Sequence, residues 1–201
     1  MAYWKRKHTT LAAILSAALT ATLFTAPTHA KELAIWDQLQ GTNPKGYVLL
    51  MRHALAPGVG DPENFNVNDC STQRNLNDEG RQDAREIGQW LQRREVKILR
   101  VESSRWCRAK ETAELLNIGK VRPNRNLDSL FQESDLLNHP QTANIKKRIQ
   151  SHRNTRGLLV FVGHFVNFQA VAGVSLDSGE GVLIKATPSG EFKVMGYSPK
   201  P

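Results

Sequence analysis

The chain has 201 residues with 27 basic and 19 acidic side chains, which give a formal net charge of +8. The basic residues form no stripe interleaved with aromatic ones, so we expect no nucleic-acid partner, and attraction of small anions explains the charge as well. The sequence has no repeats, low-complexity tracts or internal linkers, and it is long enough for one domain with a hydrophobic core.

The first 30 residues have the features of a secretory signal peptide. Lys5, Arg6 and Lys7 precede an apolar stretch over residues 11–24, and small residues lead to Ala30. The apolar stretch is shorter than the ~20 residues that a spanning helix needs. We therefore predict cleavage after Ala30 and no stable membrane insertion afterwards. A mature domain of residues 31–201 then keeps a charge of +5, because three basic residues are removed from +8. The protein is expected to be periplasmic or secreted, and the alternative is a retained N-terminal anchor.

Both cysteines, Cys70 and Cys107, lie in the predicted mature domain. An even number of cysteines in an exported chain indicates a disulfide, and two free thiols are the alternative. No Cys-x-x-Cys motif or His/Cys cluster has the spacing of a zinc site, so we expect no metal and no cofactor.

Two apolar runs, over residues 48–51 and 158–162, predict the central strands of the fold. Neither run alternates with polar residues, which is typical of strands buried on both faces of a parallel sheet. Each run is followed by a histidine: His53, after Arg52, and His164. Ligands bind beyond the carboxyl ends of strands in open α/β sheets, so we expect both histidines at one pocket. The alternative is two buried histidines with structural roles.

The other elements can be placed around these strands. In chain order we expect a helix over 33–39, a polar loop over 57–72, a helix capped by Asn77, a strand over 96–101, a helix that Ser103-Ser104 caps and Gly119 closes, an irregular segment over 121–140, a helix over roughly 141–152, a short helix before Gly173, and a hairpin over 182–194. This order predicts a three-layer α/β/α sandwich with a mostly parallel central sheet.

Four short motifs follow one another along the chain. They are Arg52-His53; Arg74-Asn75-Leu76-Asn77 with Gly80; Ser103-Ser104 with Arg108-Ala109 and Thr112-Ala113; and Gly163-His164. Together they resemble the histidine phosphatase superfamily, which has the phosphoglycerate mutase-like fold, and within it the branch of small phosphatases. The resemblance runs from Tyr47 to about Gly173. Ala54 stands where the family usually has glycine, a change outside the reacting groups.

The resemblance implies that His53 is the nucleophile and forms a phosphohistidine. Arg52, Arg108 and His164 are then expected to hold the oxygens of the transferring phosphoryl group, because planar guanidinium forks match phosphate bidentately. Arg108, rather than the nearby Arg105, fits the motif spacing. Arg74 is expected either to contact the phosphate or only to hold the loop over the pocket, whereas Asn77 and Gly80 belong to the start of a helix.

Family members commonly place the general acid in the segment before the last core strand. Here that segment offers Asp128, Glu133 and Asp135. We favour Glu133, because Leu130-Phe131 could anchor the segment and leave the next residues facing the pocket. A carboxyl in apolar surroundings keeps its proton more readily, as an acid must. The alternative is a solvated loop carboxylate.

These observations predict an exported, metal-independent phosphomonoesterase acting on a small phosphorylated substrate, with a cell-envelope phosphosugar as one candidate. One alternative is a phosphomutase of the same fold, which the short insertion between Gly119 and Pro140 disfavours. Another is a non-catalytic phosphate-binding module, which would not need His53.

Overall fold

The computed structural model describes residues 34–199, so the predicted signal peptide over residues 1–30 lies outside the described residues. Six strands form one sheet in the order β3-β2-β4-β1-β5-β6. Their bounds are β1 Tyr47–Arg52, β2 Ile98–Ser103, β3 Val121–Pro123, β4 Leu158–Gly163, β5 Gly181–Ala186 and β6 Phe192–Tyr197. The first four strands pair in parallel, and β5 and β6 form an antiparallel hairpin beside β1. The mostly parallel sheet is thus confirmed.

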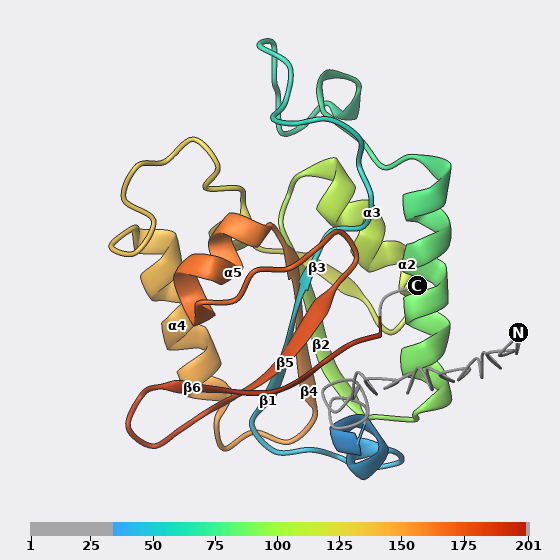
Figure 1. Ribbon diagram of the computed structural model, residues 1–201, viewed down its shortest axis with the longest axis vertical. Coiled ribbons are helices and arrows are strands. Elements are labelled where there is room, and N and C mark those ends of the chain that lie inside the picture. Colours follow the sequence, from blue (N-terminus) through green and yellow to red (C-terminus); the bar gives the residue numbers. More distant parts are fainter. Residues whose placement is uncertain (1–33, 200–201) are drawn as a thin grey trace, which may run out of the picture.

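Helices cover both faces of the sheet (Figure 1). Helices α2 (Asp78–Arg93) and α3 (Cys107–Leu115) pack on one face, together with a helical segment over residues 34–39. Helices α4 (Pro140–His152) and α5 (Phe165–Ala172) pack on the other. The three-layer sandwich is therefore confirmed. Within the described residues, none of the helices is both long and apolar enough to cross a membrane.

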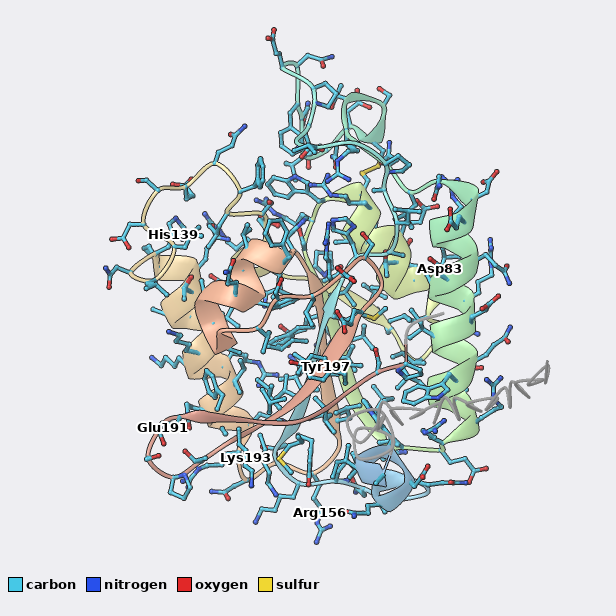
Figure 2. All side chains as sticks on the ribbon, viewed as in Figure 1. Asp83, His139, Arg156, Glu191, Lys193 and Tyr197 are labelled. Carbon is cyan, nitrogen blue, oxygen red and sulfur yellow. A yellow bond between two sulfur atoms is a disulfide. The ribbon has the colours of Figure 1, made fainter. Side chains whose placement is uncertain are left out.

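The two hydrophobic cores explain why the central strands read as unbroken apolar runs. In β1, Leu49 and Met51 join the core under α2 and α3, whereas Val48 and Leu50 join the core under α4 and α5. All four side chains are fully buried, because a strand between two helical layers has no face for solvent. Figure 2 shows the side chains that fill the space on each side of the sheet.

Three local predictions are corrected. Strand β3, paired in parallel with β2, falls in the segment expected to be irregular, because a three-residue strand carries too little periodicity to be recognised. Ser103 and Ser104 do not cap α3: Ser103 ends β2, and the residue before the helix is Trp106, which makes no side-chain cap hydrogen bond. Gly119 does not close α3. The residue with a left-handed conformation after this helix is Asn117, with φ of 49°.

The predicted start of α2 is confirmed. The Asn77 side chain accepts a hydrogen bond from the Gly80 N–H at 2.8 Å. Gly80 also brings the helix against the loop that follows β1, because a Cβ atom there would lie 2.2 Å from the carbonyl oxygen of Leu55. Helix α2 thereby packs directly under the loop that carries His53.

Candidate active site

Strand register brings the expected residues to one edge of the sheet. Strand β4 lies between β1 and β2, with Gly163 opposite Arg52 and Val162 opposite Ser103. The pairing continues one residue further, since the His53 N–H donates to the Gly163 carbonyl at 2.9 Å and the Ser104 N–H to the Val162 carbonyl at 2.9 Å. The rings of His53 and His164 come to 5.4 Å between centroids. The expectation that both histidines share one pocket is met, since both line it.

His53 is held as a neutral imidazole with one nitrogen available. Its Nδ1–H donates to the Ala54 carbonyl at 2.8 Å, and its Nε2 accepts from the Arg108 Nε–H at 3.3 Å. Burial of the ring and, after it, the positive charge of Arg108 lower the pKa of His53 from 6.5 to about 3. The ring is therefore unprotonated at neutral pH, and Nε2 carries the lone pair that a nucleophile needs.

Arg108 is buried beside His53, but its fork is occupied by a carboxylate that the sequence analysis did not single out. Its Nη1 and Nη2 donate to Oδ1 and Oδ2 of Asp61, at 2.7 and 3.1 Å. Burial would raise the pKa of Asp61, but hydrogen bonds from Arg108 and from the Arg74 N–H outweigh it and lower that pKa. Asp61 lies in the polar loop after β1, where no periodicity or motif distinguishes it from its neighbours.

Arg52 and His164 complete the cage of donors. The Nη1 of Arg52 donates to the Leu176 carbonyl at 3.1 Å, while its buried Nε has no hydrogen-bond partner among the described residues. His164 contacts the Ser104 hydroxyl through Nε2 at 3.0 Å, so Nδ1 is the nitrogen left to face a ligand. Burial, followed by the nearby His53 and Arg108, lowers the pKa of His164 well below its usual value.

Two other arginines take different places. Arg74 lines the pocket and holds the loop above it, with its Nη1 bonded to the Ala56 carbonyl and its Nε bonded to the Gly60 carbonyl at 2.8 Å. Arg105 is 46% exposed and forms an ion pair with Asp128 instead of lining the pocket. Of the two arginines, Arg108 therefore lines the pocket and Arg105 does not.

The three candidate acids are separated by the fold. Glu133 lines the pocket, but the residue is exposed and not buried among apolar side chains as expected. Asp128 is buried and accepts hydrogen bonds from the Arg105 N–H at 2.9 Å and the Arg105 Nε–H at 2.8 Å. Asp135 accepts from the Asn138 N–H and side chain. Of the three, Glu133 alone lines the pocket.

The pocket has a volume of about 740 Å³ and two aromatic walls. Phe65 stacks on Trp106 at 4.8 Å between centroids, and Phe131 meets Phe165 edge to face at 6.5 Å. Trp106 lines the pocket, and its indole N–H donates to Asp61 at 3.1 Å.

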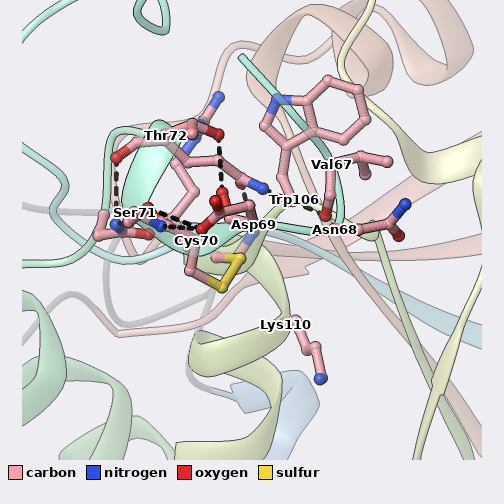
Figure 3. The surroundings of a disulfide bond; sticks show 12 residues. Val67, Asn68, Asp69, Cys70, Ser71, Thr72, Trp106 and Lys110 are labelled. Carbon is pink, nitrogen blue, oxygen red and sulfur yellow. Dashed lines mark hydrogen bonds between the residues drawn. A yellow bond between two sulfur atoms is a disulfide. The ribbon is translucent and has the colours of Figure 1, made fainter. Parts of the chain in front are cut away.

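The predicted disulfide between Cys70 and Cys107 is confirmed. Figure 3 shows this bond close to Trp106. It ties the polar loop, which carries Asp61 and leads to Arg74, to the first turn of the helix that carries Arg108. Within residues 34–199, no group of three or more His, Cys, Asp or Glu side chains is arranged to hold a metal ion.

The chain matches a known protein family. The family model described as histidine phosphatase superfamily (branch 1) matches residues 48–154, which is more than half of the chain. The match covers the strand that ends at Arg52 and the helix that carries Arg108, but ends before His164. A search of curated proteins finds no match.

Solved structures, two phosphatases among them, share the fold at low sequence identity. The protein histidine phosphatase SixA, complexed with tungstate, is 18% identical with a TM-score of 0.57, over 76% of this chain and 96% of that one. An open reading frame product from Mycobacterium tuberculosis is 16% identical with a TM-score of 0.58, over 77% and 97% of the two chains. A phosphoserine phosphatase mutant from Entamoeba histolytica, in complex with phosphoserine, is 12% identical with a TM-score of 0.54, over 76% and 96%.

Proposed function

Because this chain belongs to the histidine phosphatase superfamily, we propose that it is a phosphomonoesterase that works through a phosphohistidine on His53. The observation that carries the proposal is the state of the His53 ring. Its Nδ1–H is bonded to a carbonyl and its Nε2 lone pair faces Arg108, with Arg52 and His164 lining the same pocket. This arrangement suits attack on a phosphorus atom whose oxygens are held by fixed donors.

The reaction proceeds in two steps. In the first, His53 Nε2 attacks phosphorus, the P–N bond forms, and the bond to the ester oxygen breaks. The leaving oxygen takes a proton from a general acid, for which Glu133 is the candidate that lines the pocket. In the second step water attacks phosphorus and gives a proton to the carboxylate that the acid has become, the P–N bond breaks, phosphate is released, and the neutral imidazole and the acid are restored.

The cage stabilises the charge that develops on the phosphoryl oxygens. Arg52 and Arg108 supply positive donors, and the Nδ1 of neutral His164 can donate one hydrogen bond when it carries the ring proton. That tautomer requires the Ser104 hydroxyl to donate its one hydrogen to His164 Nε2, 3.0 Å away, and not to Asp128 Oδ1, 3.4 Å away. Arg74 serves chiefly to hold the loop above the cage, through the carbonyls of Ala56 and Gly60.

The proposed setting is outside the cytoplasm. The basic and apolar pattern over residues 1–30 supports export, and the Cys70–Cys107 disulfide is compatible with an oxidising compartment. A phosphosugar of the cell envelope is the candidate substrate, and the chemistry proposed here requires no metal or cofactor.

The test is a phosphatase screen on the purified mature chain, with a metal chelator present throughout. The wild type should hydrolyse phosphomonoesters and take up an acid-labile phosphoryl label from them. His53→Ala should stay folded, lose activity by orders of magnitude and take up no label. Near-normal turnover by this variant would exclude the mechanism, and transfer of the phosphoryl group to a second hydroxyl instead of water would favour the mutase.

A further inference from the structure

Among the acidic side chains that line the pocket in the described residues, that of Asp61 accepts the most hydrogen bonds. It accepts four hydrogen bonds: two from the Arg108 fork, one from the Arg74 N–H at 3.1 Å, and one from the Trp106 indole at 3.1 Å. Its side chain is 15% exposed, and that of Arg108 is 3% exposed. A bidentate pair so well shielded from water is stronger than an ion pair on the surface.

This pair uses the donors that a phosphoryl group needs. The Arg108 Nε lies 3.3 Å from the nucleophilic Nε2 of His53, so a phosphorus atom that reacts with Nε2 must sit beside the same guanidinium. The Nη atoms of that guanidinium would then face the phosphoryl oxygens, but Asp61 already holds both. Two anions cannot share one fork without strong like-charge repulsion.

We propose that Asp61 is a specificity-determining residue whose carboxylate occupies the Arg108 fork in the substrate-free enzyme, so that a phosphate ester binds by displacing it. The proposal rests on the proposed function, because it takes the Arg108 fork as part of the phosphate site. A phosphoryl dianion has two charges and three free oxygens, and it can engage Arg108, Arg52 and His164 together. A monoanionic carboxylate has less charge and fewer oxygens than a phosphoryl dianion, so it cannot displace Asp61. Carboxylate ligands are therefore excluded from the Arg108 fork.

The position of Asp61 in the loop allows this exchange. The neighbouring residues Pro62, Glu63 and Val59 are exposed, Val59 to 86%, so their movement uncovers no hydrophobic core. The loop is anchored before this stretch by Arg74 at the Ala56 carbonyl and after it by the Cys70–Cys107 disulfide, and Arg74 also holds the Gly60 carbonyl directly before Asp61. Displacement of Asp61 is therefore a local change.

The test measures binding of inorganic phosphate and of acetate by calorimetry, in the wild type, Asp61→Asn and Asp61→Ala. Removing the competing charge should tighten phosphate binding about tenfold, at the low end of the coupling measured for close charge pairs. Acetate binding should become measurable in both variants. The matched control is Glu63→Gln, which removes a charge from the same pocket wall, two residues from Asp61, and should change phosphate affinity less than twofold.

Kinetics provide a second measurement. In Asp61→Asn, KM and the inhibition constant of phosphate should fall, whereas a residue that only supports the fold would raise both when lost. Unchanged or weaker phosphate binding in folded Asp61 variants would overturn the proposal, and so would an equal gain in Glu63→Gln, because the effect would then be one of net charge. Absence of phosphate binding in every form, wild type included, would instead overturn the proposed function.

Discussion

The buried imidazole of His53 should make the protein less stable in acid, by an amount that the structure allows to be worked out. The folded pKa is about 3, whereas the unfolded chain has the ordinary value of 6.5. As pH falls below 6.5, the unfolded state binds a proton that the folded state cannot bind until about pH 3. Stability is therefore lost as pH falls through this window.

The expected loss follows from these two pKa values. Between pH 7 and pH 4.5, proton uptake at this one site should lower the free energy of unfolding by about 2.5 kcal/mol. In the His53→Gln variant the side chain at position 53 does not titrate, and its amide can still donate to the Ala54 carbonyl. The variant should therefore gain about 2.5 kcal/mol relative to the wild type over the same interval.

Urea unfolding at the two pH values, followed by tryptophan fluorescence, measures this difference. Equal dependence of the unfolding free energy on urea concentration at both pH values serves as the control that the same transition is compared. If the wild type and His53→Gln lose stability in parallel, His53 is not held neutral by burial, and its Nε2 is not shown to be unprotonated. The same low pKa predicts that the nucleophile remains unprotonated, and hydrolysis measurable, at pH 5.

The other predictions concern the cage, the disulfide and the acid. Arg108→Ala should lower kcat by a factor on the order of 10²–10³ and weaken vanadate inhibition, whereas Arg105→Ala should retain both; the reverse pattern would assign the phosphate contact to Arg105. Replacing Cys70 and Cys107 together by alanine should lower the free energy of unfolding by about 4 kcal/mol, as the chain-entropy model gives for two cysteines 37 residues apart, and a loss below 1 kcal/mol would contradict that model here. Glu133→Gln should impair hydrolysis of alkyl phosphates while sparing p-nitrophenyl phosphate, whose leaving group needs no proton; equal effects on both would remove Glu133 from the acid role.

The sequence by itself determined the layers of the fold and the position of the site residues that follow the two central strands. The runs that became β1 and β4 are apolar throughout because strands between two helical layers are buried on both faces. Residues that follow such strands must lie at the carboxyl edge of a parallel sheet, so Arg52, His53 and His164 could be placed together. Arg108 required its motif spacing as well, because a lone arginine near the start of a helix has no distinctive periodicity.

Only the tertiary structure decided what faces these residues. Asp61 meets Arg108 across 47 positions of sequence, from a polar loop whose path is set by the disulfide and by Arg74 and not by any local pattern. The exposure of Glu133 and the pairing of β3 were likewise undetermined, because irregular segments carry no hydrophobic periodicity to fix which side chains turn inward. The burial of helices and strands follows from a local pattern of apolar residues, which the sequence shows directly. Contacts between a loop and a distant helix leave no such local pattern and are defined only by the folded chain.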